Sequence, residues 1–215
     1  EAGMAQTLSA YYNPQTGRVA CIVKFAHGGT GLLDTIVGEN ACEGNWTPPS
    51  YEATLTPQSP GELTGGLYRK LVAYVAASAD KIAAMGCAPR VRGLFWMQGE
   101  EDRYAPDDYQ KAFACFVSDL RRDLGEALGD DLSAMPVYVG EISRTFVSAG
   151  EADIRMNERF IAMQNELAAA IPFVTVIPSA DFDINPGGTD PYHFSGADML
   201  KIGKLVGEAI LRTLP

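Results

Sequence analysis

The stretch of the sequence best suited to chemistry lies near the C-terminus, at Asp190-Pro191-Tyr192-His193-Phe194-Ser195-Gly196. A carboxylate three residues before a histidine can accept a hydrogen bond from one ring nitrogen and fix the tautomer, which leaves the other nitrogen free to take a proton from a nucleophile. The chain has only two histidines, His27 and His193, so few other groups could act as a general base. The alternative interpretation is that Asp190 caps a turn and His193 is an ordinary surface histidine, because this spacing is a short pattern.

Two further polar stretches follow apolar segments. His27-Gly28-Gly29-Thr30-Gly31 comes directly after the apolar residues 20–26, and Gln98-Gly99-Glu100-Glu101-Asp102 comes after residues 91–97. Glycines let backbone N–H groups approach a ligand closely, although two glycines after a strand are often only a turn. In a parallel sheet, ligands bind at the carboxyl ends of the strands. We therefore expect these two stretches to converge with residues 190–193 on one edge of a sheet.

The elements that must position these residues alternate along the chain. Apolar runs predict strands, and apolar residues at helical spacing predict the helices between them. Ser195 is expected to be the N-cap of a closing helix, and Gly86 the C-cap of an earlier one. The alternation favours a parallel sheet with helices on both faces in a single domain. The predicted strands are residues 20–26, 91–97, 136–142 and 173–177, and the predicted helices are 63–85, 107–124, 152–170 and the segment after Ser195.

Size and charge restrict the partners. The 215 residues suffice for one domain with a sizeable core, and the formal net charge of -10 argues against nucleic acid and against an anionic membrane surface. No apolar run approaches the roughly 20 residues of a membrane span.

The four cysteines lie far apart with no Cys-x-x-Cys pair, which argues against a zinc site. Cys21 and Cys115 fall in apolar stretches, where we expect buried thiols. The composition of residues 34–62 predicts a long loop that carries Trp46 and Tyr51, and we interpret it as a wall facing the substrate. The candidate substrate contacts are Trp46 in this loop and His27 in the preceding glycine-rich stretch.

Three blocks resemble a known family. Trp96-Met97-Gln98-Gly99-Glu100-Glu101-Asp102 resembles the Trp-x-Gln-Gly-Glu-x-Asp block of the sialate O-acetylesterase and acetylxylan esterase branch of the SGNH hydrolases. Ala26-His27-Gly28-Gly29-Thr30 resembles the Gly-Gly block of that branch, and Asp190-x-x-His193 resembles the Asp-x-x-His block of SGNH hydrolases in general. The blocks occur in the family's order. The resemblance implies a three-layer αβα, flavodoxin-like domain covering residues 1–215.

The resemblance also implies a role for each matching residue. His193 would be the general base and then the general acid, oriented by Asp190. The side chain of Gln98 and a backbone N–H of Gly28 or Gly29 would form the oxyanion hole, while Glu100 and Asp102 would hold the loop in shape by hydrogen bonding. The substrate would be an acetyl ester of a small sugar or polysaccharide. No metal or organic cofactor is implied, and many relatives are secreted or periplasmic.

One departure from the family pattern concerns the nucleophile. The family's serine belongs to a Gly-x-Ser-Asn block at the end of the first strand, and no such block occurs in these 215 residues. The opening Glu1-Ala2-Gly3-Met4 resembles the segment that follows that block. We therefore expect the first strand and the nucleophilic serine to lie upstream of Glu1, so that the domain is incomplete at its N-terminus. Ser143 and Ser195 are the less favoured alternatives, because Ser195 is better explained as a helix cap.

The favoured prediction is a carbohydrate esterase that removes O-acetyl groups from sugars by a Ser-His-Asp mechanism. The alternative is a non-catalytic carbohydrate-binding protein on the same fold that has lost its nucleophile. A flavodoxin-like nucleotide-binding domain is disfavoured, because no glycine-rich phosphate loop opens a helix and the charge is acidic.

Overall fold

The computed structural model describes residues 1–12, 17–33, 44–55, 63–146, 149–182, 184 and 192–213. The chain divides into two compact units. Unit 1 comprises Glu1–Ile22, Gly93–Met97 and Pro136–Pro215, and unit 2 comprises Val23–Arg92 and Gln98–Met135. That the whole chain behaves as one domain stays a prediction.

Unit 1 is built on a parallel sheet of three short strands. They are β1 (Leu94–Trp96), β2 (Val137–Gly140) and β3 (Val174–Ile177), in the spatial order β1-β2-β3. Leu94 pairs with Val137, which in turn pairs with Val174. Each strand lies inside a segment predicted to be a strand. All of β2 is buried, which fits a central strand covered on both faces.

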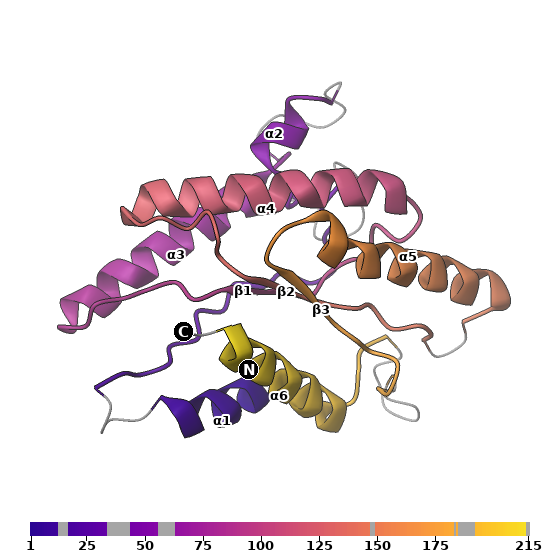
Figure 1. Ribbon diagram of the computed structural model, residues 1–215. Coiled ribbons are helices and arrows are strands. Elements are labelled where there is room, and N and C mark those ends of the chain that lie inside the picture. The colour runs from indigo at the N-terminus through magenta and orange to yellow at the C-terminus, as the bar shows by residue number, and fades with distance from the viewer. Residues whose placement is uncertain are drawn as a thin grey trace. The chain divides into compact units, whose positions relative to one another are not determined.

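Helices flank the sheet of unit 1 (Figure 1). α5 (Glu151–Ala170) buries Phe160, Met163 and Leu167, and α6 (Gly196–Thr213) buries Ile202 and Val206. These spacings of three or four residues place the apolar side chains on one stripe of each helix. In Figure 1, α5 and α6 lie on opposite sides of the strands. The predicted α/β fold, with a parallel sheet between helices, is confirmed.

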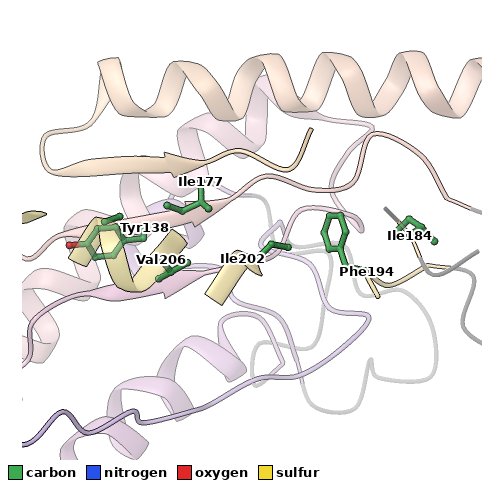
Figure 2. Close-up of a cluster of buried hydrophobic side chains, with 7 residues drawn as sticks. Tyr138, Ile177, Ile184, Phe194, Ile202 and Val206 are labelled. Atoms are coloured by element: carbon green, nitrogen blue, oxygen red, sulfur yellow. The ribbon is translucent and has the colours of Figure 1, made fainter. Parts of the chain in front are cut away.

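The core of unit 1 holds the segment that carries His193. Tyr138 and Ile177 from the sheet pack with Ile202 and Val206 from α6, as Figure 2 shows, and Phe194 and Ile184 extend the same cluster. Ile184 and Phe194 also form an antiparallel bridge. The residue directly after His193 is therefore fixed by burial and by backbone pairing.

α1 (Ala2–Tyr11) packs on α6 through glycines. A Cβ added to Gly3 would lie 2.0 Å from the carbonyl oxygen of Leu200, and one added to Gly207 would lie 2.7 Å from Cβ of Thr7. Real Cβ atoms do not approach other atoms so closely. The two helix backbones can therefore come this near only because glycine stands at these positions.

Unit 2 contains α2 (Pro49–Glu52), α3 (Gly66–Ala84) and α4 (Pro106–Leu128). α3 and α4 pack through aromatic rings, with the centroids of Tyr68 and Phe116 5.8 Å apart. The fully buried Asp119 of α4 accepts hydrogen bonds from the backbone N–H and the hydroxyl of Ser50, which ties α2 to α4. Gly86 follows α3 with φ of +82°, in keeping with the predicted C-cap.

The prediction of a strand over residues 20–26 is wrong. This segment has no strand assignment, and Cys21 and Val23 are exposed. The chain passes from unit 1 to unit 2 between Ile22 and Val23, so the segment connects two cores rather than crossing one. An apolar run predicts a strand only where a neighbouring strand is available to pair with it. The expected burial of Cys21 is wrong for the same reason.

Within residues 1–12, the chain forms α1. Among the described helices, none is both long enough and apolar enough to cross a bilayer. Cys115 is partly exposed rather than buried, and Cys21, Cys87 and Cys115 are free thiols. Of the predicted loop over 34–62, residues 34–43 and 56–62 lie outside the described residues.

Candidate functional site

The best-defined polar arrangement in unit 2 is centred on Asp102. Its Oδ2 accepts hydrogen bonds from the backbone N–H of Leu32 at 2.6 Å and from Nε2 of Gln98 at 2.8 Å, and its Oδ1 accepts one from the backbone N–H of Leu33 at 3.3 Å. The side chain is 0% exposed. Asp102 thus joins the loop after Gly31 to the loop after β1. Gly31 lies so close that an added Cβ would meet Oδ1 of Asp102 at 2.9 Å.

Burial has a marked effect on this carboxyl group. Loss of solvation raises the pKa of Asp102 to about 6, while the hydrogen bonds from Leu32, Gln98 and Leu33 act in the opposite direction. The carboxylate is therefore the main form at neutral pH, and its protonation begins only slightly below neutrality. A protonated Asp102 would be a poorer acceptor for the three N–H groups that it holds.

Gln98 is fixed by the same cluster. Its Nε2 donates to the carbonyl oxygen of Thr30 at 3.1 Å as well as to Asp102. Because both acceptors face the nitrogen, the orientation of the amide is determined by its contacts. The backbone carbonyl of Gln98 accepts a hydrogen bond from the hydroxyl of Tyr109 at 3.2 Å. To donate to an oxyanion, Nε2 would have to exchange the Thr30 carbonyl for it.

The oxygen of the Gln98 amide is unusual in unit 2. Oε1 is buried and has no hydrogen-bond partner among the described residues. A buried acceptor without a donor is costly, by about 1–3 kcal/mol. The amide is therefore held by its nitrogen alone, and a donor arriving at Oε1 would find an unused acceptor there.

Trp46 is buried in unit 2 rather than exposed on its surface. Its indole N–H donates to the hydroxyl of Thr30 at 2.8 Å, and its backbone N–H donates to the carbonyl of Gly31 at 3.0 Å. The side chain packs edge-on against Phe25. With 3% of its surface exposed, Trp46 presents no open ring face to a sugar, which argues against the predicted substrate contact.

The predicted Gly-Gly loop also belongs to unit 2. His27 is partly exposed, and its carbonyl oxygen accepts a hydrogen bond from the hydroxyl of Thr30 at 2.8 Å. Gly29 has φ of +64°, a conformation that favours glycine. Gly28 is exposed, and nothing lies within 4 Å of a Cβ added there. Glu100 is exposed at the start of the turn that leads to Asp102. The roles of these residues in an oxyanion hole stay predictions.

The predicted base lies in unit 1. His193 is exposed, and Asp190 lies outside the described residues, so the predicted contact between them stays a prediction. Ser195 is the N-cap of α6, as expected. Its Oγ accepts a hydrogen bond from the backbone N–H of Asp198 at 3.1 Å and donates one to the Asp198 carboxylate at 2.7 Å. The hydroxyl of Ser143 donates to the carbonyl of Thr145 at 2.6 Å.

A buried polar cluster at the carboxyl ends of β2 and β3 was not foreseen as a group. Glu141 accepts hydrogen bonds from the backbone N–H of Ser179 at 2.8 Å and from the side chain of Asn165 at 2.7 Å. Gln164, which is fully buried, accepts one from the backbone N–H of Ile142 at 3.0 Å and donates to the carbonyl of Gly140 at 3.3 Å. Polar residues at buried helix positions of α5 were the available signal in the sequence. Among the described residues, no group of acidic, histidine and cysteine side chains could hold a metal ion.

Comparison with known proteins identifies relatives of the chain. A family model described as carbohydrate esterase, sialic acid-specific acetylesterase, matches residues 2–212. No curated protein matches. A solved structure of a protein from Arabidopsis thaliana, determined by X-ray methods at 1.6 Å resolution, is similar with a TM-score of 0.51 and 19% sequence identity. The match covers 69% of this chain and 53% of that one, about half of its length, and at this identity it supports the fold alone.

Proposed function

The chain belongs to the carbohydrate esterase family of sialic acid-specific acetylesterases, and from this we propose that it is a serine esterase that removes O-acetyl groups from sugars. The observation that carries the proposal is the extent of the family match, which runs over residues 2–212 and includes every block singled out in the sequence. The substrate is an acetyl ester of a small sugar or of a polysaccharide.

In the proposed reaction, a serine hydroxyl attacks the acetyl carbonyl carbon while His193 takes the hydroxyl proton. Asp190 orients the imidazole. Collapse of the tetrahedral intermediate breaks the bond to the sugar oxygen, and His193 returns the proton to that oxygen, so the sugar leaves as an alcohol. Water then hydrolyses the acetyl-enzyme by the same steps, which releases acetate and restores the serine.

Gln98 and a backbone N–H of Gly28 or Gly29 would stabilise the oxyanion. The hydrogen bond from Nε2 to Asp102 supports this role, because it holds the amide in one orientation, whereas the N–H bonded to the Thr30 carbonyl would have to turn to the oxyanion. Asp102 anchors that amide and the Leu32–Leu33 backbone together. A donor aimed at an oxyanion typically contributes about 3 kcal/mol, and the weaker bond to the Thr30 carbonyl is the one that the substrate would replace.

We propose that neither Ser143 nor Ser195 is the nucleophile. The hydroxyl of Ser195 forms both hydrogen bonds of the cap of α6. Loss of these bonds would leave the first turn of that helix uncapped. The hydroxyl of Ser143 closes its own loop by donating to Thr145. Neither oxygen is poised to give its proton to a base.

The test is covalent labelling of the full-length protein with a fluorophosphonate, followed by intact mass and peptide mapping, with acetate release from O-acetylated sugars measured in parallel. We expect one adduct on a serine other than 143 or 195, and a His193→Gln variant that loses labelling and lowers hydrolysis by about 10²–10⁴-fold. Ser143→Ala is the matched control and should retain both. An adduct on Ser143 would keep the esterase and overturn this assignment of its nucleophile.

A non-catalytic carbohydrate-binding protein is the second candidate. The observation that favours it is that Nε2 of Gln98 already has two acceptors, which leaves the amide no free N–H for an oxyanion. This candidate predicts sugar binding without labelling by the fluorophosphonate and without acetate release. Labelling of a serine would exclude it.

A further inference from the structure

An exposed aromatic ring stands next to the proposed base in unit 1. Tyr192, the residue before His193, is 64% exposed. Its ring lies against that of Phe146, with centroids 5.6 Å apart and an interplanar angle of 47°. Phe146 is only partly exposed and packs against the core cluster of unit 1. One ring of the pair is therefore anchored, and the other is open to solvent.

The loop that carries Phe146 is held in place by α5. Nδ2 of Asn157 donates to the carbonyl oxygens of Ser143 at 3.1 Å and Arg144 at 3.2 Å. Asn157 itself is buried, with 3% of its surface exposed, so the donor of both bonds is shielded from water. Arg144 also pairs with Glu158 of the same helix. Phe146 thus follows a loop whose backbone is fixed at two consecutive residues.

The chain on the other side of the pair is fixed as well. Phe194 is buried in the core cluster and pairs with Ile184 through its backbone, and Ser195 caps α6. His193 and Tyr192 immediately precede these anchors. The proposed base and an aromatic residue are therefore consecutive in the sequence, and the backbone directly after them is held in place.

We propose that Tyr192, supported by Phe146, is the surface on which the sugar ring of the substrate stacks during deacetylation at His193. One face of a pyranose is a layer of C–H groups, which packs on the electron-rich face of an aromatic ring, and the phenol hydroxyl adds a polar contact at the ring edge. A free tyrosine would lose entropy when a sugar orders it, and the contact with Phe146 reduces that loss. The inference rests on the proposed function, since it concerns the sugar portion of that substrate.

The experiment compares two esters that share the acetyl group. The first is an O-acetylated methyl glycoside, and the second is ethyl acetate, which has no ring. For Tyr192→Ala we expect KM for the sugar ester to rise roughly tenfold while kcat/KM for ethyl acetate stays within about twofold. Tyr192→Phe keeps the ring and loses only the polar contact, so its KM for the sugar ester should rise far less than that of Tyr192→Ala. Phe146→Ala should show part of the effect of Tyr192→Ala.

The matched control is Tyr11→Ala. Tyr11 is another exposed tyrosine of unit 1, 46% exposed, whose ring contacts a neighbouring aromatic residue, Tyr12, at a centroid distance of 5.0 Å. It lies on α1 and should leave both esters unaffected. An equal loss on both esters in Tyr192→Ala would show that the ring only supports the fold near His193. An unchanged KM for the sugar ester would overturn the proposal outright.

Binding of the deacetylated methyl glycoside separates this proposal from the proposed esterase activity. NMR titration of the full-length protein with that sugar needs no turnover. If the protein hydrolyses neither ester but binds the sugar in a manner lost in Tyr192→Ala, the stacking surface stands and the esterase proposal fails. If the protein hydrolyses ethyl acetate but neither binds the sugar nor prefers its ester, the esterase stands and the stacking surface is refuted.

Discussion

The buried carboxyl group of Asp102 should impose a measurable pH dependence on folding stability. Its ordinary pKa is 3.8, and burial raises the pKa in the folded protein to about 6. The folded state therefore binds this proton more tightly than the unfolded chain. The resulting stabilisation is complete below pH 3.8 and is lost as the pH rises through 6. The difference of about 2.2 pKa units corresponds to a loss of about 3 kcal/mol.

Asp102→Asn removes this ionisation while keeping the shape of the side chain. At pH 4, the side chain at position 102 is uncharged in the folded state of both the unmodified protein and the variant. The variant should be less stable by about 1 kcal/mol, because its NH₂ group faces an N–H donor of the Leu32–Leu33 backbone. At pH 7, the variant avoids the cost of a buried charge and should be more stable by about 2 kcal/mol. We therefore expect the two stability curves to cross between these pH values.

Urea unfolding of both proteins from pH 4 to pH 7.5 measures the difference, in which the other titrating groups cancel. Asp131→Asn is the matched control, because hydrogen bonds from Ser133 lower the pKa of the exposed Asp131 carboxyl group. Its stabilisation is present above the ordinary pKa of 3.8 and is lost only as the pH falls below that value, so its difference should stay nearly flat between pH 4 and pH 7.5. A flat difference for Asp102→Asn, or a carboxyl ¹³C titration of Asp102 with a midpoint below 3.8, would refute the reasoning.

Three further substitutions, two of them with a comparison variant, test contacts within each unit. Gly207→Ala places a Cβ 2.7 Å from a side-chain carbon of α1 and should lower stability by about 1–3 kcal/mol, whereas Gly196→Ala meets nothing within 4 Å and should be neutral or slightly stabilising; thermal unfolding compares them. Asp119→Ala removes the acceptor of both hydrogen bonds from Ser50 and should cost about 0.5–1.5 kcal/mol in urea unfolding, because the exposed Ser50 can bond water instead, and this is more than Ser50→Ala should cost. Gln164→Leu removes the acceptor of a buried N–H after β2 and should cost about 1–3 kcal/mol, and an unchanged urea midpoint would contradict this.

The sequence was sufficient to predict the elements whose burial follows from periodicity. β2 and β3 lie within predicted runs, and α3, α4 and α5 lie close to the predicted helices. The prediction of a strand over residues 20–26 was wrong, because an apolar run does not show whether another strand is available to pair with it. The glycine contact between α1 and α6 could not be foreseen either, since glycines in a helix usually weaken it unless another backbone approaches.

For the candidate site, the sequence suggested that Asp102 holds a loop by hydrogen bonding, but not which atoms it contacts. The block from Gln98 to Asp102 was identified by resemblance, but its hydrogen bonds reach Leu32 and Thr30, about 70 positions away in the chain. Trp46 illustrates the limit most clearly. A tryptophan in a polar loop was expected to face substrate, whereas its indole N–H finds a buried acceptor in Thr30. A polar partner within reach decides whether a loop tryptophan is buried, and local sequence does not contain that information.

The segment around His193 shows how an exposed histidine can be held on its C-terminal side without belonging to a helix or strand. Its neighbours on the C-terminal side have separate tasks: Phe194 is buried and bridged to Ile184, and Ser195 begins α6. Both of these anchors, the bridge at Phe194 and the cap at Ser195, lie on the C-terminal side of the histidine. Tyr192, on the other side of the histidine, is the residue that we propose contacts the sugar. On this proposal, substitution at Tyr192 alters sugar recognition while the anchors at Phe194 and Ser195 stay in place.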